Sequence, residues 1–224
     1  MTAQSRRLTQ DLESLHSDIE AMALRVEEDL RKAILALRSR DGVLAARVKA
    51  DDRRVNSLQG SIQDFAVSLI ATKQPVARDL RELVASIRLA DRLERSGDYT
   101  VHLAKTASRL GEGCWPHQCE LLARMGEIGC SMIQQMIEAW LAKDLEAARS
   151  CIARDKEIDE LHHRLIGLTL AMIKDRPMEA EEAVRLIRTS GFMERLGDHI
   201  ANACELIEYT VEGTQPHKDR QDDI

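Results

Sequence analysis

Residues 92–105 read RLERSGDYTVHLAK, and residues 192–209 read FMERLGDHIANACELIEY. Both stretches contain the motif Glu-Arg-x-Gly-Asp, and their glutamates, Glu94 and Glu194, are 100 positions apart (194 − 94). In a helix, the two acids of each motif lie one turn apart, where like charges repel by roughly a few tenths of a kcal/mol. A chain that repeats this arrangement either tolerates it on a solvated surface or requires negative charge there.

Outside these motifs, apolar residues spaced three and four apart run along almost the whole chain, as in amphipathic helices. Glycine, proline and their neighbours interrupt the pattern at Asp41-Gly42, Lys73-Gln74-Pro75, Gly111-Glu112-Gly113 and Arg176-Pro177. The pattern predicts six helices, at about 7–39, 43–72, 76–110, 117–142, 144–174 and 178–212. Asp144 is placed to be the N-cap of the fifth helix.

The order of two long helices, a proline and a third long helix occurs twice, which indicates an internal repeat. Short connections favour antiparallel neighbours. The sequence therefore predicts an all-α fold of two tandem three-helix up-down bundles, at residues 1–112 and 113–213, followed by a polar tail at 214–224. A helix of about 30 residues is ~45 Å long, so we expect an elongated molecule.

Composition supports this fold and excludes several functions. Of 224 residues, 31% are charged and only 3% are aromatic, as in helical bundles. The net charge of −6 argues against nucleic-acid binding, which requires a basic surface. The sequence shows neither a signal peptide nor a membrane span, so we expect a cytoplasmic protein that is at most peripheral to a membrane.

The cysteines carry little functional signal. Five of them, an odd number without zinc-site spacing, favour reduced thiols. The segment Cys114-Trp-Pro-His-Gln-Cys119 resembles part of a metal site, but no second Cys/His pair completes it.

Acidic residues interrupt the apolar stripes of the helices that carry the repeated motif and of their neighbours. The first acidic cluster consists of Asp52, Asp91, Glu94 and Asp98, and the second of Asp155, Asp159, Glu194 and Asp198. Acids on an inward-facing stripe require compensation, and oxygen-rich sets suit hard cations such as Mg²⁺, Mn²⁺ or iron. The repetition favours metal binding over a solvated acidic face, with His162 as an additional ligand of the second cluster. Gly97 and Gly197 each cost about 1 kcal/mol relative to alanine in a helix, so both are expected to admit a close neighbour.

Glu94-Arg-Ser-Gly-Asp98, Glu194-Arg-Leu-Gly-Asp198 and ATKQPVARDLR at 71–81 resemble the PhoU family of phosphate-signalling accessory proteins over about residues 7–213. The resemblance implies two three-helix bundles with E(D)xxxD motifs that bind iron, manganese, magnesium or zinc ions. It assigns Asp155, Asp159, Glu194 and Asp198 to one site, and Asp52, Glu94 and Asp98 to the other. Position 56 departs from the pattern, because Asn56 stands where an acid is expected. Since Asn56 offers a carbonyl oxygen without charge, the first site is expected to be weaker, unless Asp91 compensates.

The resemblance also implies a function and partners. Members of this family associate with the ATPase subunit of a membrane phosphate ABC transporter and with a sensor histidine kinase. They repress the phosphate-starvation response and limit phosphate uptake. A regulatory, non-catalytic homodimer is therefore expected.

Two alternatives remain open on the sequence alone. A ferritin-like di-iron oxidase would use the Glu-x-x-His pairs Glu13/His16 and Glu160/His163, although the repeat places these in different bundles. A structural helical adaptor with solvated acids and no metal would have the same fold. No nucleophile–base constellation or glycine-rich phosphate loop supports an enzyme.

Overall fold

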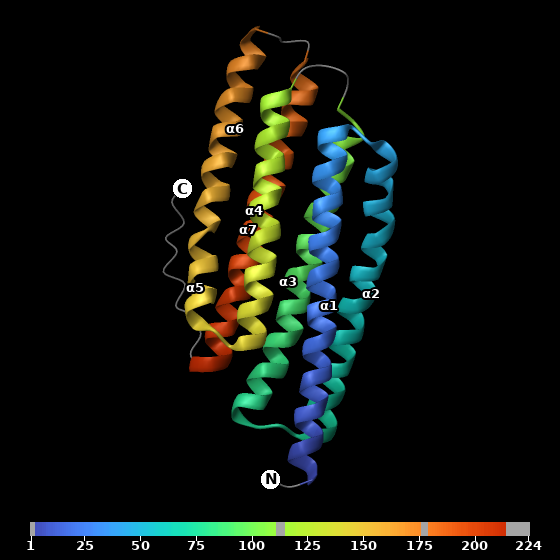
Figure 1. Ribbon diagram of the computed structural model, residues 1–224, viewed down its shortest axis with the longest axis vertical. Helices are drawn as coiled ribbons and strands as arrows, with labels where there is room; N and C mark the ends of the chain where they lie inside the picture. The colour runs from blue at the N-terminus through green and yellow to red at the C-terminus, as the bar shows by residue number, and fades with distance from the viewer. Residues whose placement is uncertain (1–2, 111–114, 176–178, 214–224) are drawn as a thin grey trace.

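The computed structural model describes residues 3–110, 115–175 and 179–213, and its secondary structure in these ranges is helical. The first half contains α1 (Ala3–Ser39), α2 (Gly42–Lys73) and α3 (Ala77–Ala107). The second half contains α4 (Pro116–Ala142), α5 (Leu145–Ala153), α6 (Asp155–Asp175) and α7 (Ala180–Glu212). All run along one long axis, so the molecule is elongated as predicted (Figure 1).

Two aspartates start corresponding helices in the two halves. The Asp41 carboxylate accepts hydrogen bonds from two backbone N–H groups of the first turn of α2, each at 2.9 Å. Asp144 caps α5 in the same way, at 2.9 and 3.0 Å, which confirms the predicted N-cap. At the end of α2, Gln74 has left-handed backbone geometry with φ of 49°, directly before Pro75. The predicted breaks at 111–113 and 176–177, and Cys114, lie outside the described residues.

The prediction of one continuous helix at 144–174 is wrong, because the chain leaves regular α-helix at Arg154. The Arg154 N–H donates to Cys151 O at 3.1 Å, and Glu157 N–H donates to Arg154 O at 3.0 Å. These are tight three-residue turns, and Arg154 keeps right-handed backbone angles, so the helix bends without reversing. The Arg154 guanidinium holds the bend by donating to Ser131 Oγ on α4 at 2.7 Å. The bend places Asp155 in the first turn of α6.

The two halves form a pair of three-helix bundles. α1, α2 and α3 pack together, as do α4, α7 and the α5–α6 pair, and α3 lies along α7 while α1 lies along α4. Residues 91–107 and 191–207 have the same burial class at every position. The repeat predicted from the sequence is therefore confirmed in the packing, with an offset of 100 residues.

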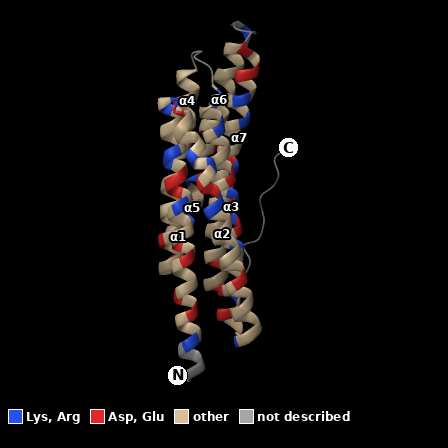
Figure 2. Ribbon diagram, turned by 90° about the vertical axis from the view of Figure 1, so that its right-hand side faces the viewer, with Lys and Arg blue, Asp and Glu red and all other residues tan. Residues whose placement is uncertain are grey.

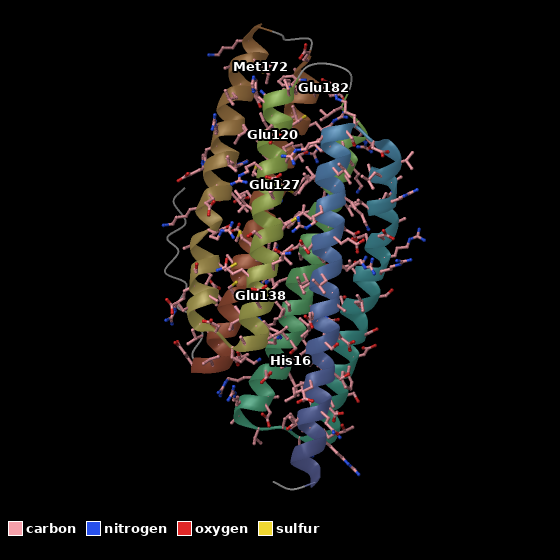
Figure 3. The ribbon with its side chains drawn as sticks, viewed as in Figure 1. His16, Glu120, Glu127, Glu138, Met172 and Glu182 are labelled. Carbon is pink, nitrogen blue, oxygen red and sulfur yellow. The ribbon has the colours of Figure 1, made fainter. Side chains whose placement is uncertain are left out.

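A buried ion-pair network joins the bundles at the lower end of the molecule, where Figure 3 labels His16. Glu82 on α3 is 7% exposed; its Oε1 lies 2.7 Å from His16 Nε2 and accepts a hydrogen bond from Lys143 Nζ at 2.7 Å. Lys143 also lies 4.1 Å from the ring centre of the fully buried Trp140. Because these residues come from α1, α3 and the end of α4, the network fixes the first bundle against the second.

Lys and Arg residues are interspersed with Asp and Glu residues along the helices (Figure 2). In the described part of the chain, no helix combines the length and the apolar character that a membrane span requires.

Candidate metal centre

The second acidic cluster is organised by a close approach between α6 and α7. Asp155, at the start of α6, is only 6% exposed and lies against Gly197 of α7. A Cβ on Gly197 would be 2.5 Å from Asp155 Oδ1 and 2.9 Å from Ile158 Cδ1. Both distances are shorter than a real Cβ contact allows. The glycine is therefore what lets the Asp155 carboxylate reach the surface of α7 beside Asp198.

The first acidic cluster repeats this arrangement between α2 and α3, with more space. A Cβ on Gly97 would lie 3.5 Å from Asp52 Oδ1 and 3.4 Å from Val55 Cγ1. The prediction that both glycines admit a close neighbour is confirmed at Gly197, whereas the contacts at Gly97 are ones that a Cβ would also allow. In each repeat that neighbour is an acidic residue, so the glycine and the acid form one structural unit.

Neighbouring carboxylates raise the pKa values of two acids in the first cluster, which indicates that its acids lie close together. Burial, followed by the carboxylates of Asp98 and Asp29, raises the pKa of Asp52. Burial and then Asp98 raise the pKa of Glu94, with Asp91 and Asp52 contributing less. Asp98, Asp91 and Asp52 are thus within electrostatic reach of Glu94, and Asp98 is also within reach of Asp52.

The second cluster shows the same effect. Burial raises the pKa of Glu194 first, and the carboxylates of Asp198 and Asp159 raise it further. Arg195 and His163 oppose the rise only in part. Asp198 and Asp159 are therefore within electrostatic reach of Glu194. Asp155 lies beside them, against Gly197 of α7.

Asp29 on α1 is a member of the first cluster that the sequence analysis missed. It is 3% exposed, and its Oδ1 accepts from Lys32 Nζ at 3.1 Å. Its other oxygen, Oδ2, is buried without a hydrogen-bond partner among the described residues, as is Asp52 Oδ1. A signal existed in the sequence, since Asp29 follows Val26 by three positions and precedes Ala33 by four, on the apolar stripe. Asp29 was overlooked because it also belongs to the charged run Glu27-Glu28-Asp29.

The two additional candidate ligands are placed differently from the acids. Asn56 is exposed, whereas its counterpart Asp159 is half-buried. His162 is half-buried, and its Nδ1 is 2.8 Å from Ser190 Oγ on α7. Burial and the neighbouring His163 lower the pKa of His162. The contact with Ser190 thus fixes His162 against α7, one turn before Glu194, and it occupies the Nδ1 of the ring.

The donor chemistry of both clusters fits a hard cation. Each offers carboxylate oxygens at half-buried positions, the first has orphaned buried oxygens, and the glycines bring the acids against the neighbouring helix. Among the residues described, however, no three His, Cys, Asp or Glu side chains already converge as an ion-binding group. An ion would have to draw the carboxylates of a cluster together.

The geometry excludes the di-iron oxidase constructed from the two Glu-x-x-His pairs. Glu13, Glu160 and His163 are all exposed, and His16 is bound to Glu82. In addition, α1 and α6 do not contact each other within the described ranges, so the pairs cannot share a metal centre.

A family model described as the PhoU domain matches the chain twice, over residues 19–107 and 122–207. The chain belongs to the PhoU family. Each match covers one acidic cluster with its glycine. The chain is 30% identical over 207 residues to a protein of Caulobacter vibrioides named phosphate-specific transport system accessory protein PhoU homolog. That alignment covers 92% of this chain and 90% of the relative. A PhoU homolog of Clostridium acetobutylicum is 29% identical over 206 residues, covering 92% of this chain and 94% of the relative.

Solved PhoU structures have the same fold. The crystal structure of PhoU from Pseudomonas aeruginosa superimposes with a TM-score of 0.87 and 29% identity, covering 92% of this chain and 99% of that one. The phosphate transport system regulatory protein PhoU from Streptococcus pneumoniae gives a TM-score of 0.86 and 27% identity, covering 94% and 99%. The arrangement of two tandem three-helix bundles is therefore that of the PhoU family.

Proposed function

We propose that this chain is a regulatory accessory protein of phosphate transport that acts without catalysis. The observation that carries the proposal is the family relationship over nearly the full chain, in which both halves keep the acidic motif and its glycine. The relatives are named as accessory proteins of the phosphate-specific transport system. By the resemblance, the protein couples the ATPase subunit of a phosphate ABC transporter to a sensor histidine kinase at the cytoplasmic face.

Metal binding at the two acidic clusters is part of this proposal. Asp155, Asp159, Glu194 and Asp198 would hold an ion in the second cluster, with His162 at its edge. Asp52, Glu94 and Asp98 would hold one in the first, with Asp91, Asn56 or Asp29 as additional oxygen ligands. The ion, of iron, manganese, magnesium or zinc, would neutralise charges that otherwise repel one another. The orphaned buried oxygens and the raised pKa values of Asp52, Glu94 and Glu194 support it.

Gene deletion with complementation tests the regulatory role. In high phosphate, the deletion strain is expected to express alkaline phosphatase and to take up excess phosphate, and the wild-type gene is expected to restore repression. A deletion strain that stays repressed, in a background without a second gene of this family, would contradict the proposal. Complementation with Glu194→Ala/Asp198→Ala then shows whether regulation requires the second cluster.

A homodimer is also proposed, because the helices leave large apolar side chains exposed. On α1, Leu24 is 50% exposed and Leu35 is 57% exposed. These two residues are 11 positions apart (35 − 24), close to three turns, so they share one face of α1. Light scattering of metal-loaded protein at micromolar concentration is expected to give twice the monomer mass. A monomer under those conditions would contradict the dimer.

A further inference from the structure

The C-terminal end of α3 and the beginning of α7 enclose a pocket rich in cationic side chains. The two helices lie side by side along the middle of the molecule (Figure 1), and the pocket between them has a volume of about 370 Å³. Its lining includes His102, Lys105, Arg109, Arg185, Arg188 and Phe192. Four of these side chains are Lys or Arg, in a protein whose formal net charge is −6.

Among the residues that the structure describes, only one of these four cations forms an ion pair. Arg185 is engaged, since it donates to Arg109 O at 2.8 Å and to Glu181 Oε1 at 2.9 Å. Glu181 is the acidic residue of the lining. The side chains of Lys105, Arg109 and Arg188 form no ion pair with any residue that the structure describes. Within the described ranges, three cations of the pocket are thus free of ion pairs and available for a bound anion, although Lys105 also acts electrostatically on Asp52.

The internal repeat shows that the fold does not impose this charge. With the offset of 100 residues, the positions equivalent to Lys105, Arg109 and Arg185 are Glu205, Tyr209 and Ala85. Of the four cationic positions, only Arg188 has a cationic counterpart, Arg88. The equivalent helices thus carry the cationic set at one end of the α3–α7 pair and not at the other.

One wall of the pocket is aromatic. The rings of His102 and Phe192 stack with their centres 4.1 Å apart and an interplanar angle of 18°. Burial, Lys105 and Arg188 lower the pKa of His102, which places both cations beside this wall. A flat apolar surface next to several cations can accept a planar ring together with a charged group.

We propose that this pocket binds an anion with two linked phosphate groups, either free pyrophosphate or the diphosphate of a nucleotide. Three unpaired Lys and Arg side chains match the charge of a diphosphate, and guanidinium groups bind phosphate oxygens through paired N–H donors. The volume exceeds what pyrophosphate alone requires and lies at the lower end of the range for nucleotide-sized ligands. In the nucleotide, the base would lie against Phe192 and His102. No residue of its lining belongs to either acidic cluster, although Lys105 acts electrostatically on Asp52, and the proposed site goes beyond the proposed role in phosphate regulation.

Titration calorimetry of the purified full chain with pyrophosphate, ADP, inorganic phosphate and sulfate tests the proposal. The titrations are made with EDTA present, so that no metal–nucleotide complex reaches the acidic clusters. Arg188→Glu and Arg88→Glu are matched variants, because both arginines are exposed and occupy equivalent positions. The two substitutions also change the net charge equally. Lys105→Glu is a second pocket variant.

We expect pyrophosphate and ADP to bind more tightly than inorganic phosphate and sulfate. Arg188→Glu and Lys105→Glu are each expected to weaken this binding at least about tenfold, and Arg88→Glu is expected to leave it within about twofold. Tighter binding of ADP than of pyrophosphate would assign the nucleotide as ligand, and equal binding would assign the diphosphate alone. Equal losses from Arg188→Glu and Arg88→Glu would overturn the site, as would sulfate binding as tight as pyrophosphate or no binding at millimolar concentration.

Discussion

Gly197 and Asp155 are so close that a methyl group on Gly197 would be 2.5 Å from the Asp155 carboxylate oxygen. The equivalent distance in the first repeat, from Gly97 to Asp52, is 3.5 Å. The same glycine–acid contact thus exists in both repeats, but only the second is too tight for any other residue. This difference makes the two glycines a matched pair for experiment.

Gly197→Ala is expected to destabilise the protein, and Gly97→Ala is not. The new methyl at position 197 would displace Asp155 and Ile158, and overpacking of this kind costs about 1–3 kcal/mol. At position 97 the methyl meets ordinary contacts, so the gain of roughly 1 kcal/mol in helix propensity should dominate. Urea unfolding of both variants measures the difference. A stability loss at Gly97 equal to that at Gly197 would contradict the assigned geometry.

Glu82→Gln is expected to weaken the joint between the bundles at neutral pH. Burial alone would raise the pKa of Glu82, but hydrogen bonds from His16 and Lys143 outweigh it and lower the pKa from 4.5 to about 2. Because the folded-state pKa is depressed, the ionised form contributes stability above pH 4.5, and this contribution disappears as the pH falls towards about 2. The shift corresponds to about 3 kcal/mol.

The stability difference between wild type and Glu82→Gln should therefore be largest above pH 5 or so and shrink below about pH 4. Urea unfolding over this pH range measures it. Glu138→Gln is the control, since Glu138 is an exposed glutamate on α4, labelled in Figure 3. A Glu82→Gln effect that does not change with pH would show that packing, and not charge, accounts for the role of Glu82.

Glu194→Ala/Asp198→Ala is expected to remove more bound metal than Glu94→Ala/Asp98→Ala. The second cluster has four acids in the motif positions, whereas the first has the exposed, uncharged Asn56 at one of them. A larger carboxylate set holds a hard cation more tightly. Elemental analysis of protein purified without chelator, together with thermal unfolding with and without metal, measures the loss. Wild-type stability should rise by about 2.7 kcal/mol at a hundredfold excess of metal over the dissociation constant.

Asp29→Asn tests whether another acid compensates for Asn56 in the first cluster. If both double variants lose the same amount of metal, the buried Asp29 or Asp91 compensates for Asn56, and Asp29→Asn in the wild-type background should then lower metal binding by the first cluster. No loss from either double variant would leave the acids as a solvated, metal-free surface. That result would contradict the metal-binding part of the proposed function without affecting the family assignment.

Asp41→Ala and Asp144→Ala are expected to destabilise the protein by similar amounts, about 1 kcal/mol each. Each substitution removes a carboxylate that accepts two backbone N–H groups at the start of α2 or α5. Asp→Asn at the same positions should retain most of the stability, because an amide oxygen also caps a helix. Thermal unfolding of the four variants checks this, and an alanine effect near zero at either position would contradict the assigned cap.

The sequence by itself determined the helical fold, the internal repeat and the positions of the motif acids. These depend on local properties: the three-and-four spacing of apolar residues, Pro75 after α2, the caps at Asp41 and Asp144, and the identical Glu-Arg-x-Gly-Asp motif. Gly197 was informative because glycine in a helix has a local cost, and its close contact with Asp155 explains that cost; at Gly97 the contacts are ordinary and do not require glycine. Family membership followed from the same residues.

The tertiary structure alone decided which side chains meet across the helices. The bend at Arg154 contains neither glycine nor proline, and it depends on a contact with Ser131 of another helix. Glu82 is 66 positions from His16 (82 − 16) and 61 from Lys143, so no local pattern joins them. The cationic pocket likewise forms only where α3 and α7 lie side by side. Periodicity shows which face of a helix is buried, but long-range packing determines which neighbouring helix covers that face.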